Sequence, residues 1–147
     1  MHCVRFNPVE TSLLGAAASD RSIILYDARE TRPMRKVILD MRTNAISWNP
    51  MEAFVFLAAN EDYNVYSFDV RLVLHAVLDL KFPKSFETYQ FYFIYFNYHF
   101  NSPRALKRPL NVHMDHISAV TDVDYAPTGR EFVTGSYDKT VSNKTSV

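Results

Sequence analysis

Two short stretches of the sequence place an arginine two residues after an aspartate, behind an aromatic side chain. The first reads "YDAR" and contains Asp27 and Arg29, and the second reads "FDVR", contains Asp69 and Arg71, and follows after 42 residues. The rigid fork of a guanidinium suits carboxylates and carbonyls, and arginines and aromatics often anchor protein interfaces. These residues therefore predict recognition of a partner rather than bond-making chemistry. The alternative is that both aspartates are structural and both arginines are solvated.

Three further aspartates, Asp20, Asp62 and Asp138, carry the side chain expected of an acid–base catalyst. They stand in "SDRS", "EDYN" and "YDKT", which are turn sequences in which aspartate accepts hydrogen bonds from nearby backbone N–H groups. Catalysis requires carboxylates that converge on one cleft, and three residues in three separate, similar turns do not converge. We predict that all three aspartates are structural.

Metal and phosphate chemistry find little support in the sequence. In "HMDH", His113 and Asp115 would share one face of a strand while His116 lies on the other, which is poor geometry for zinc. Three glycines in 147 residues nearly exclude a phosphate-binding loop. Arrangements of the Gly-x-Ser-x-Gly, Cys–His or paired-Glu type do not occur. The sequence predicts no enzyme activity, no metal site and no cofactor.

The elements that position these residues are repeated along the chain. "VRFNP" at 4–8 recurs as "ISWNP" at 46–50, the stretches around Asp20 and Asp62 match at the same offset of 42, and a third copy begins with "VDYAP" at 123–127. In each copy, short runs rich in Val, Ile, Phe and Tyr alternate with turn residues, which predicts β-strands. Four short strands in about 40 residues is the spacing of a propeller blade. We expect strands near 3–6, 13–18, 22–27, 34–39, 44–48, 54–58 and 63–68.

The third copy resembles a repeat of the WD-repeat family. Its stretch 115–141 has His116, Tyr125, Pro127 and Asp138 where that family has its histidine, its aromatic–x–Pro and its turn aspartate. The resemblance implies an all-β fold, part of a WD40-type β-propeller of about two and a half blades, in which His116 hydrogen-bonds within its blade. Because neighbouring blades bury each other's faces, we expect this chain alone to fold poorly or to aggregate.

A narrower resemblance is carried by "WNPMEAF" and "ANEDYN". These resemble the family of WD-repeat and SOF-domain-containing proteins, over about residues 4–71 and 105–141. The likeness implies a non-enzymatic scaffold in nucleolar pre-rRNA processing and small ribosomal subunit assembly. It would act in the nucleus and nucleolus, with protein partners from the small-subunit processome and the pre-rRNA ribonucleoprotein.

Two alternatives to the scaffold function remain open. The first is a substrate receptor of a cullin-RING E3 ubiquitin ligase, because the Asp27–Arg29 and Asp69–Arg71 pairs resemble the motif with which such receptors dock on the ligase adaptor. The second is a truncated gene product without function. Replacement of both arginines would separate the first alternative from the scaffold function.

Residues 72–104 interrupt the repeat pattern. They include "YQFYFIYFNYHFN" at 89–101, which is largely Phe and Tyr and has no Asp, Glu, Lys or Arg. A solvated propeller loop of this length would be polar and rich in glycine. The composition is typical of A/T-rich codons and suggests a retained intron, and the alternative is a genuine insertion that forms a hydrophobic docking loop. The expected division is two blades at 1–71, this insert outside the fold, a third, incomplete repeat at 105–141 and a divergent tail at 142–147.

The bulk composition adds little that is specific. Sixteen basic residues balance sixteen acidic ones, so no net charge favours nucleic acid or a membrane. The basic run "RETRPMRK" at 29–36 could contact rRNA phosphates, but such runs are usually solvated loops. Cys3 is the only cysteine, which excludes an intramolecular disulfide. No window has the roughly 18 apolar residues of a membrane helix, so we expect an intracellular protein with neither a membrane nor a small-molecule partner.

Overall fold

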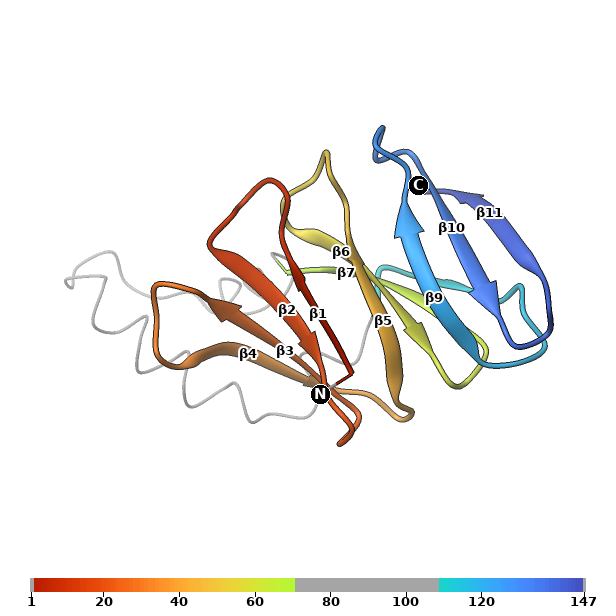
Figure 1. The fold of residues 1–147 in the computed structure, drawn as a ribbon, viewed down its shortest axis with the longest axis horizontal. Helices are drawn as coiled ribbons and strands as arrows, with labels where there is room; N and C mark the ends of the chain where they lie inside the picture. The colour runs from red at the N-terminus through yellow and green to blue at the C-terminus, as the bar shows by residue number, and fades with distance from the viewer. Residues whose placement is uncertain (1, 71–108, 147) are drawn as a thin grey trace, which may run out of the picture.

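A computed structural model describes residues 2–70 and 109–146, and both parts consist of antiparallel β-strands (Figure 1). The first sheet contains β1 (Cys3–Phe6), β2 (Leu13–Ala17), β3 (Ser22–Asp27) and β4 (Pro33–Ile38). The second contains β5 (Thr43–Trp48), β6 (Val55–Asn60), β7 (Val65–Asp69) and β8 (Asn111–His113). The third contains β9 (Val120–Tyr125), β10 (Glu131–Ser136) and β11 (Val141–Thr145). Sheets of four, four and three strands confirm the predicted all-β, partial-propeller fold.

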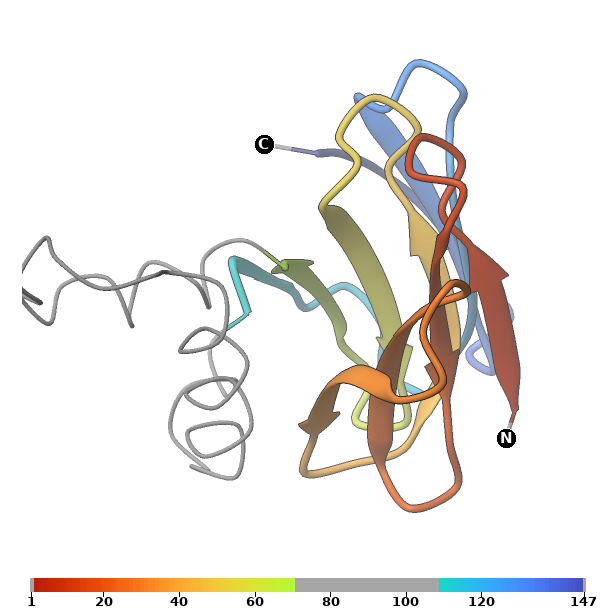
Figure 2. The same cartoon turned by 90° about the vertical axis from the view of Figure 1, so that its left-hand side faces the viewer.

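The three sheets lie side by side, with the second sheet in the middle (Figures 1 and 2). The first strand of each sheet packs on the next, β1 on β5 and β5 on β9. Burial follows from this order. In β10 of the third sheet, buried and exposed residues alternate, whereas every residue of β6 in the middle sheet is buried. A strand covered by neighbours on both faces cannot show the alternation of a half-buried strand.

Two hydrophobic cores fill the spaces between the sheets. Between the first and second sheets, the core consists of Cys3, Leu13, Ala17, Ile23, Leu25, Val37, Ile46, Trp48, Phe56, Ala58 and Phe68. Between the second and third sheets, it consists of Ala45, Leu57, Ala59, Val65, Val120, Val123, Tyr125 and Phe132. Cys3 is thus a buried apolar residue in the first core. Each of these cores is built from the residues of two neighbouring sheets, so each repeat depends on its neighbour for part of its apolar burial, as propeller blades do.

Trp48 is the centre of the contact between the first two sheets. Its ring is 5% exposed and stacks obliquely on Phe56 with the ring centroids 5.2 Å apart. Its Nε1–H donates across the interface to the carbonyl of Arg5 at 3.1 Å. Gly15 of β2 lies under the indole, and a Cβ at that position would come within 3.3 Å of Cζ2. The absence of a side chain at residue 15 lets the indole approach the backbone of the first sheet this closely.

The two Asn-Pro sequences tie successive blades together. The Asn7 side-chain carbonyl accepts hydrogen bonds from the next turn of its own loop, and its Nδ2 donates to the carbonyl of Ala53 in the second blade. Asn49 repeats this arrangement, because its Nδ2 donates to the carbonyl of Gly129 in the third blade at 3.1 Å. The third copy has Ala126 at this position, which has no side-chain donor. The same residue type therefore makes both junctions among the described blades.

Arg35 makes a further junction between the first two sheets. It belongs to the basic run for which we expected a solvated loop, but that expectation is wrong at this residue. Arg35 is 4% exposed in β4, and its Nη1 donates to the carbonyl of Val70, just after β7, at 2.5 Å. Burial lowers the pKa of the guanidinium, and the negative charge of Asp69 opposes that change. The alternation of β4 turns Arg35 inward, a property that the charge count does not reveal.

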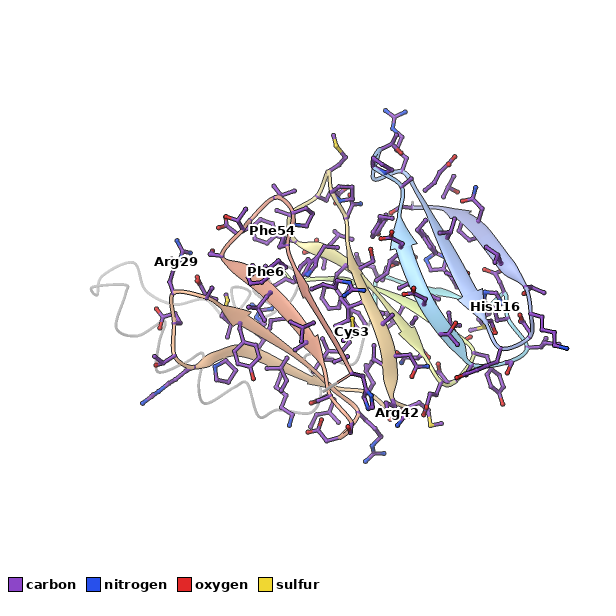
Figure 3. The ribbon with its side chains drawn as sticks, viewed as in Figure 1. Cys3, Phe6, Arg29, Arg42, Phe54 and His116 are labelled. Carbon is purple, nitrogen blue, oxygen red and sulfur yellow. The ribbon has the colours of Figure 1, made fainter. Side chains whose placement is uncertain are left out.

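The outer face of the first sheet carries exposed apolar side chains. Val4, Phe6 and Ile38 lie on the face of the sheet opposite the first core and are exposed. Phe6, labelled in Figure 3, is 62% exposed. A single exposed apolar residue is ordinary, but three on one sheet face resemble the blade faces that are covered elsewhere in the molecule. This exposure is the physical basis of the expected tendency of the chain to aggregate.

Two features differ from the division read from the sequence. β8 precedes the third repeat in the chain but pairs with β7, so residues 111–113 complete the second sheet. Residues 142–145, expected in a divergent tail, continue β11 and pair with β10. The aromatic insert at 72–104 lies outside the described residues, as does Arg71.

The two described parts of the chain contain no helix of the length and apolarity needed to cross a membrane.

Candidate functional site

Asp27 and Arg29 form a closed pair where β3 ends. The Nε of Arg29 donates to Oδ1 of Asp27 at 3.0 Å and its Nη2 donates to Oδ2 at 2.8 Å. The backbone N–H of Arg29 also donates to Oδ1, at 2.9 Å. The Arg29 side chain is 72% exposed, whereas that of Asp27 is 17% exposed, and Figure 3 places Arg29 at the outer edge of the first sheet. The aspartate therefore fixes the position of an exposed arginine before any partner binds.

The electrostatics of the pair follow from these bonds. The hydrogen bonds from the Arg29 side chain and backbone hold the pKa of the Asp27 carboxyl below its usual value. The side-chain bonds to Asp27, and then its negative charge, raise the pKa of Arg29, with smaller contributions from the negative charges of Glu10 and Glu30. The sequence did not predict that Glu10 would influence Arg29. The charge of Glu10 acts on Arg29 because the loop between β1 and β2 lies beside the loop between β3 and β4. A backbone bond from Ala28 N–H to the carbonyl of Ser12, at 2.7 Å, joins the two loops.

The second motif is placed in part. Asp69 is the last residue of β7, just as Asp27 is the last residue of β3. Val70 therefore corresponds to Ala28 in the two motifs. The N–H of Val70 donates to the carbonyl of Phe54 at 2.9 Å, and its carbonyl accepts from buried Arg35. The chain is thus anchored immediately before Arg71. The expectation for Arg71 itself falls outside the described residues and stays a prediction.

Asp20 and Asp62 lie in tight turns and bond within them. Asp20 accepts from the N–H and hydroxyl of Ser22 and from Lys36 Nζ, the last at 2.8 Å, and these bonds, that of Lys36 first, lower its pKa to about 2. Asp62 accepts from the N–H of Asn64 at 3.3 Å and from the hydroxyl of Tyr66. Both carboxylates thus hold the turns in which they lie.

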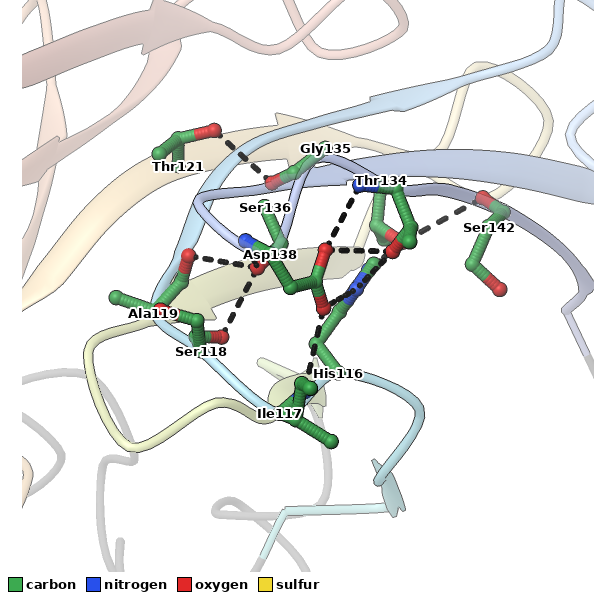
Figure 4. Close-up of polar contacts among 11 residues, drawn as sticks. His116, Ile117, Ser118, Ala119, Thr121, Thr134, Gly135, Ser136, Asp138 and Ser142 are labelled. Atoms are coloured by element: carbon green, nitrogen blue, oxygen red, sulfur yellow. Dashed lines mark hydrogen bonds and ion pairs between the residues drawn. The ribbon is translucent and has the colours of Figure 1, made fainter.

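Asp138 closes a buried polar network with His116 (Figure 4). The Nδ1 of His116 donates to Oδ2 of Asp138 at 2.9 Å, and its Nε2 is hydrogen-bonded to the hydroxyl of Thr134 at 2.8 Å. The side chains of His116 and Asp138 are 2% and 5% exposed. Asp138 also accepts from the N–H and hydroxyl of Thr140 and from the N–H of Ile117. These bonds, that of the Thr140 hydroxyl first, hold the pKa of Asp138 far below its usual value.

The three turn aspartates share one backbone feature. The residue that follows each of them has a positive φ, 64° at Arg21, 72° at Tyr63 and 67° at Lys139. Non-glycine residues rarely adopt this conformation. Its recurrence at one position of every repeat shows that the three turns have the same geometry, with the aspartate bonding the N–H two residues on.

The histidines and acids of "HMDH" are distributed among separate contacts. His113 is hydrogen-bonded to Ser67 and meets the edge of Phe132, with ring centroids 4.9 Å apart. Asp115 pairs with Lys144 at 2.8 Å, and His116 belongs to the buried network. Within residues 2–70 and 109–146, no three His, Cys, Asp or Glu side chains gather as a metal ion would require.

Comparison with known proteins agrees with this architecture. The model of the family "WD domain, G-beta repeat" matches residues 107–142. The chain is 49% identical to the DDB1- and CUL4-associated factor 13 of Danio rerio over 138 residues, which cover 94% of this chain and 24% of that protein. The human protein of the same name is 52% identical over the same share.

A yeast relative shows the same relationship. The protein SOF1 of Saccharomyces cerevisiae is 44% identical over 94% of this chain and 22% of its own length. The chain therefore spans about a quarter of the length of these relatives. Together with the three stacked blades, these similarities show that the chain belongs to the WD-repeat family that includes SOF1 and DDB1- and CUL4-associated factor 13.

Proposed function

We propose that this chain is part of a non-enzymatic propeller scaffold that acts in nucleolar pre-rRNA processing and small ribosomal subunit assembly. The observation that supports the proposal is its similarity to SOF1 along nearly the whole chain, combined with the function that the family resemblance implies. Among the described residues, Asp20, Asp62 and Asp138 hold turns and Arg35 joins two blades, and these are roles that a scaffold uses. On this proposal the protein works in the nucleus and nucleolus, with partners from the small-subunit processome and the pre-rRNA ribonucleoprotein.

The scaffold function predicts association with pre-ribosomal particles. An epitope-tagged form of the chain, expressed in cells, should sediment with particles larger than the free protein and co-precipitate precursors of the small-subunit rRNA. A tagged, unrelated WD-repeat protein of another compartment is the control for non-specific retention. Sedimentation of the tagged chain only as free protein, without precursor rRNA, would contradict the scaffold function for this chain.

A second function is favoured by the Asp27–Arg29 pair. Relatives of this chain are named for their association with DDB1 and CUL4. We propose that this chain, as part of a substrate receptor of a cullin-RING ubiquitin ligase, docks on such an adaptor through Arg29. An exposed arginine that is already held in place loses little conformational entropy on binding, which makes it suited to anchor an interface.

Removal of the guanidinium tests the adaptor function. Arg29→Ala is expected to weaken binding of the chain to purified DDB1 by about 30-fold or more, the loss typical of an arginine hot spot. Arg32→Ala is the matched control, because Arg32 is an exposed arginine on the same loop and has no ion pair within the described residues. Isothermal titration calorimetry gives both dissociation constants. If the two variants lost the same affinity for DDB1, the loop would contribute only non-specific positive charge, and docking on the adaptor through Arg29 would be wrong.

A further inference from the structure

The surroundings of Arg29 restrict the chemistry of the partner that it can meet. The Nε and Nη2 of Arg29 donate to Asp27, and the Nη1 of Arg29 makes no hydrogen bond within the described residues. A partner can therefore reach the outer N–H groups of the guanidinium. The positive charge of Arg29 is already balanced by Asp27 at 2.8 Å, so the pair as a whole presents hydrogen-bond donors without net charge.

The groups beside this neutral pair are mainly acidic. Glu10 and Glu30 are exposed. Glu30 follows Arg29 in the chain and its N–H donates to the carbonyl of Asp27 at 3.0 Å, and Glu10 lies in the loop that the bond from Ala28 N–H to the Ser12 carbonyl holds beside the loop of Arg29. Both negative charges act on Arg29. The carboxylate of Glu10 accepts only a hydroxyl, that of Ser12, at 2.9 Å, and neither glutamate has an ion pair within the described part of the chain. Arg32 adds one positive charge on the same loop. Two unpaired carboxylates against one arginine leave the region around Arg29 net negative.

A partner carboxylate is a poor match for this surface. It would receive hydrogen bonds from Arg29, but it would also be repelled by Glu10, Glu30 and the carboxylate of Asp27. A carbonyl oxygen accepts the same hydrogen bonds without that repulsion. Lysine or arginine side chains placed beside the carbonyl would gain from both glutamates.

We propose that the adaptor surface that meets Arg29 is basic: it offers a carbonyl oxygen to Arg29 and cationic side chains to Glu10 and Glu30. This inference rests on the adaptor function proposed above and specifies the chemistry of the same site. The "YDAR" motif alone fits either a carboxylate or a carbonyl acceptor on the partner, and the inference selects the carbonyl.

Charge reversal of the two glutamates tests the inference. The double variant Glu10→Lys/Glu30→Lys is expected to bind purified DDB1 about tenfold more weakly at low salt, and the loss should shrink as ionic strength rises. Asp40→Lys/Asp122→Lys is the matched control, because it makes the same change in net charge at two exposed residues outside the loop of Arg29. Thermal unfolding of each variant checks that the fold is retained.

The outcomes separate the inference from the function on which it rests. Weaker binding of the glutamate variant, with the control unchanged, supports a basic partner surface. Binding that is unchanged or tighter, while Arg29→Ala still loses affinity, overturns the inference and leaves the adaptor function intact. If the unmodified chain does not bind DDB1, the adaptor function fails, and the inference fails with it.

Discussion

Replacing Trp48 with alanine is expected to unfold most of this chain under conditions in which the parent is folded. The substitution removes the side chain that fills the space between the first two sheets, together with its bond to the Arg5 carbonyl and its contact with Phe56. Loss of a buried tryptophan costs about 3–5 kcal/mol. The whole stability of a domain is about 5–15 kcal/mol, and a three-blade unit with an exposed apolar face lies at the low end of that range. Urea unfolding followed by circular dichroism measures the change.

A milder variant controls for the loss of the aromatic ring. Trp48→Phe keeps an aromatic ring over Gly15 and beside Phe56 but removes the indole N–H and part of the packed area. We expect its unfolding midpoint to lie between those of the parent and Trp48→Ala. If Trp48→Ala lowered the midpoint no more than an exposed substitution such as Tyr63→Ala does, the stacked arrangement of the first two blades would be wrong.

Replacing His116 with alanine has the second large expected effect. The imidazole is 2% exposed, and its removal takes one hydrogen-bond partner from the Asp138 carboxylate and one from the Thr134 hydroxyl. Asp138 keeps its bonds from Thr140 and Ile117. A side chain that makes two such hydrogen bonds contributes about 1–3 kcal/mol to stability. The loss of stability should affect mainly the third blade, because the network joins the loop before β9 to the turn between β10 and β11. Hydrogen exchange should therefore become faster in β9 to β11 before it does so in β1 to β4.

An exposed histidine provides the control for the network. His2 is exposed, and its side chain makes one hydrogen bond within the described residues, to Ser19. His2→Ala keeps the backbone bond to Ala17 and should change the free energy of unfolding by about 0.5 kcal/mol or less. Similar losses for the two histidine variants would contradict a stabilising role of the buried network. Uniform acceleration of exchange in all three sheets would contradict its assignment to the third blade alone.

Local sequence was sufficient to predict β1 to β7 to within two residues at each end, but not β8 or the full length of β11. The first two repeats have the same aspartate, aromatic and proline positions 42 residues apart, and both fold into antiparallel sheets whose third strand ends at the aspartate of the Asp-x-Arg motif. The turn aspartates could be recognised for the same reason, since an aspartate and the N–H two residues on are fixed by local backbone geometry. These features depend on contacts within a few residues, which is the range over which a single sequence is informative.

Contacts between blades could not be predicted in this way. Arg35 belongs to a basic run typical of a surface loop, and only its place in β4 beside the end of β7 makes it a buried junction. The amide bond from Asn49 to Gly129 joins residues 80 positions apart. Glu10 acts on Arg29 because two loops of one sheet meet. Each of these depends on how sheets and loops pack, which the repeat pattern does not specify.

The measurement that tests the central claim most directly is a nuclear Overhauser spectrum of the chain, read from the indole of Trp48. The sequence contains one tryptophan, so its signals are unambiguous. Stacked blades predict cross-peaks from the indole ring to the α protons of Gly15 and from its N–H to Arg5, residues that lie on a different sheet. Cross-peaks to Phe56 alone, with none to the first sheet, would contradict the account, because they would show hairpins that fold separately rather than adjoining blades of a propeller.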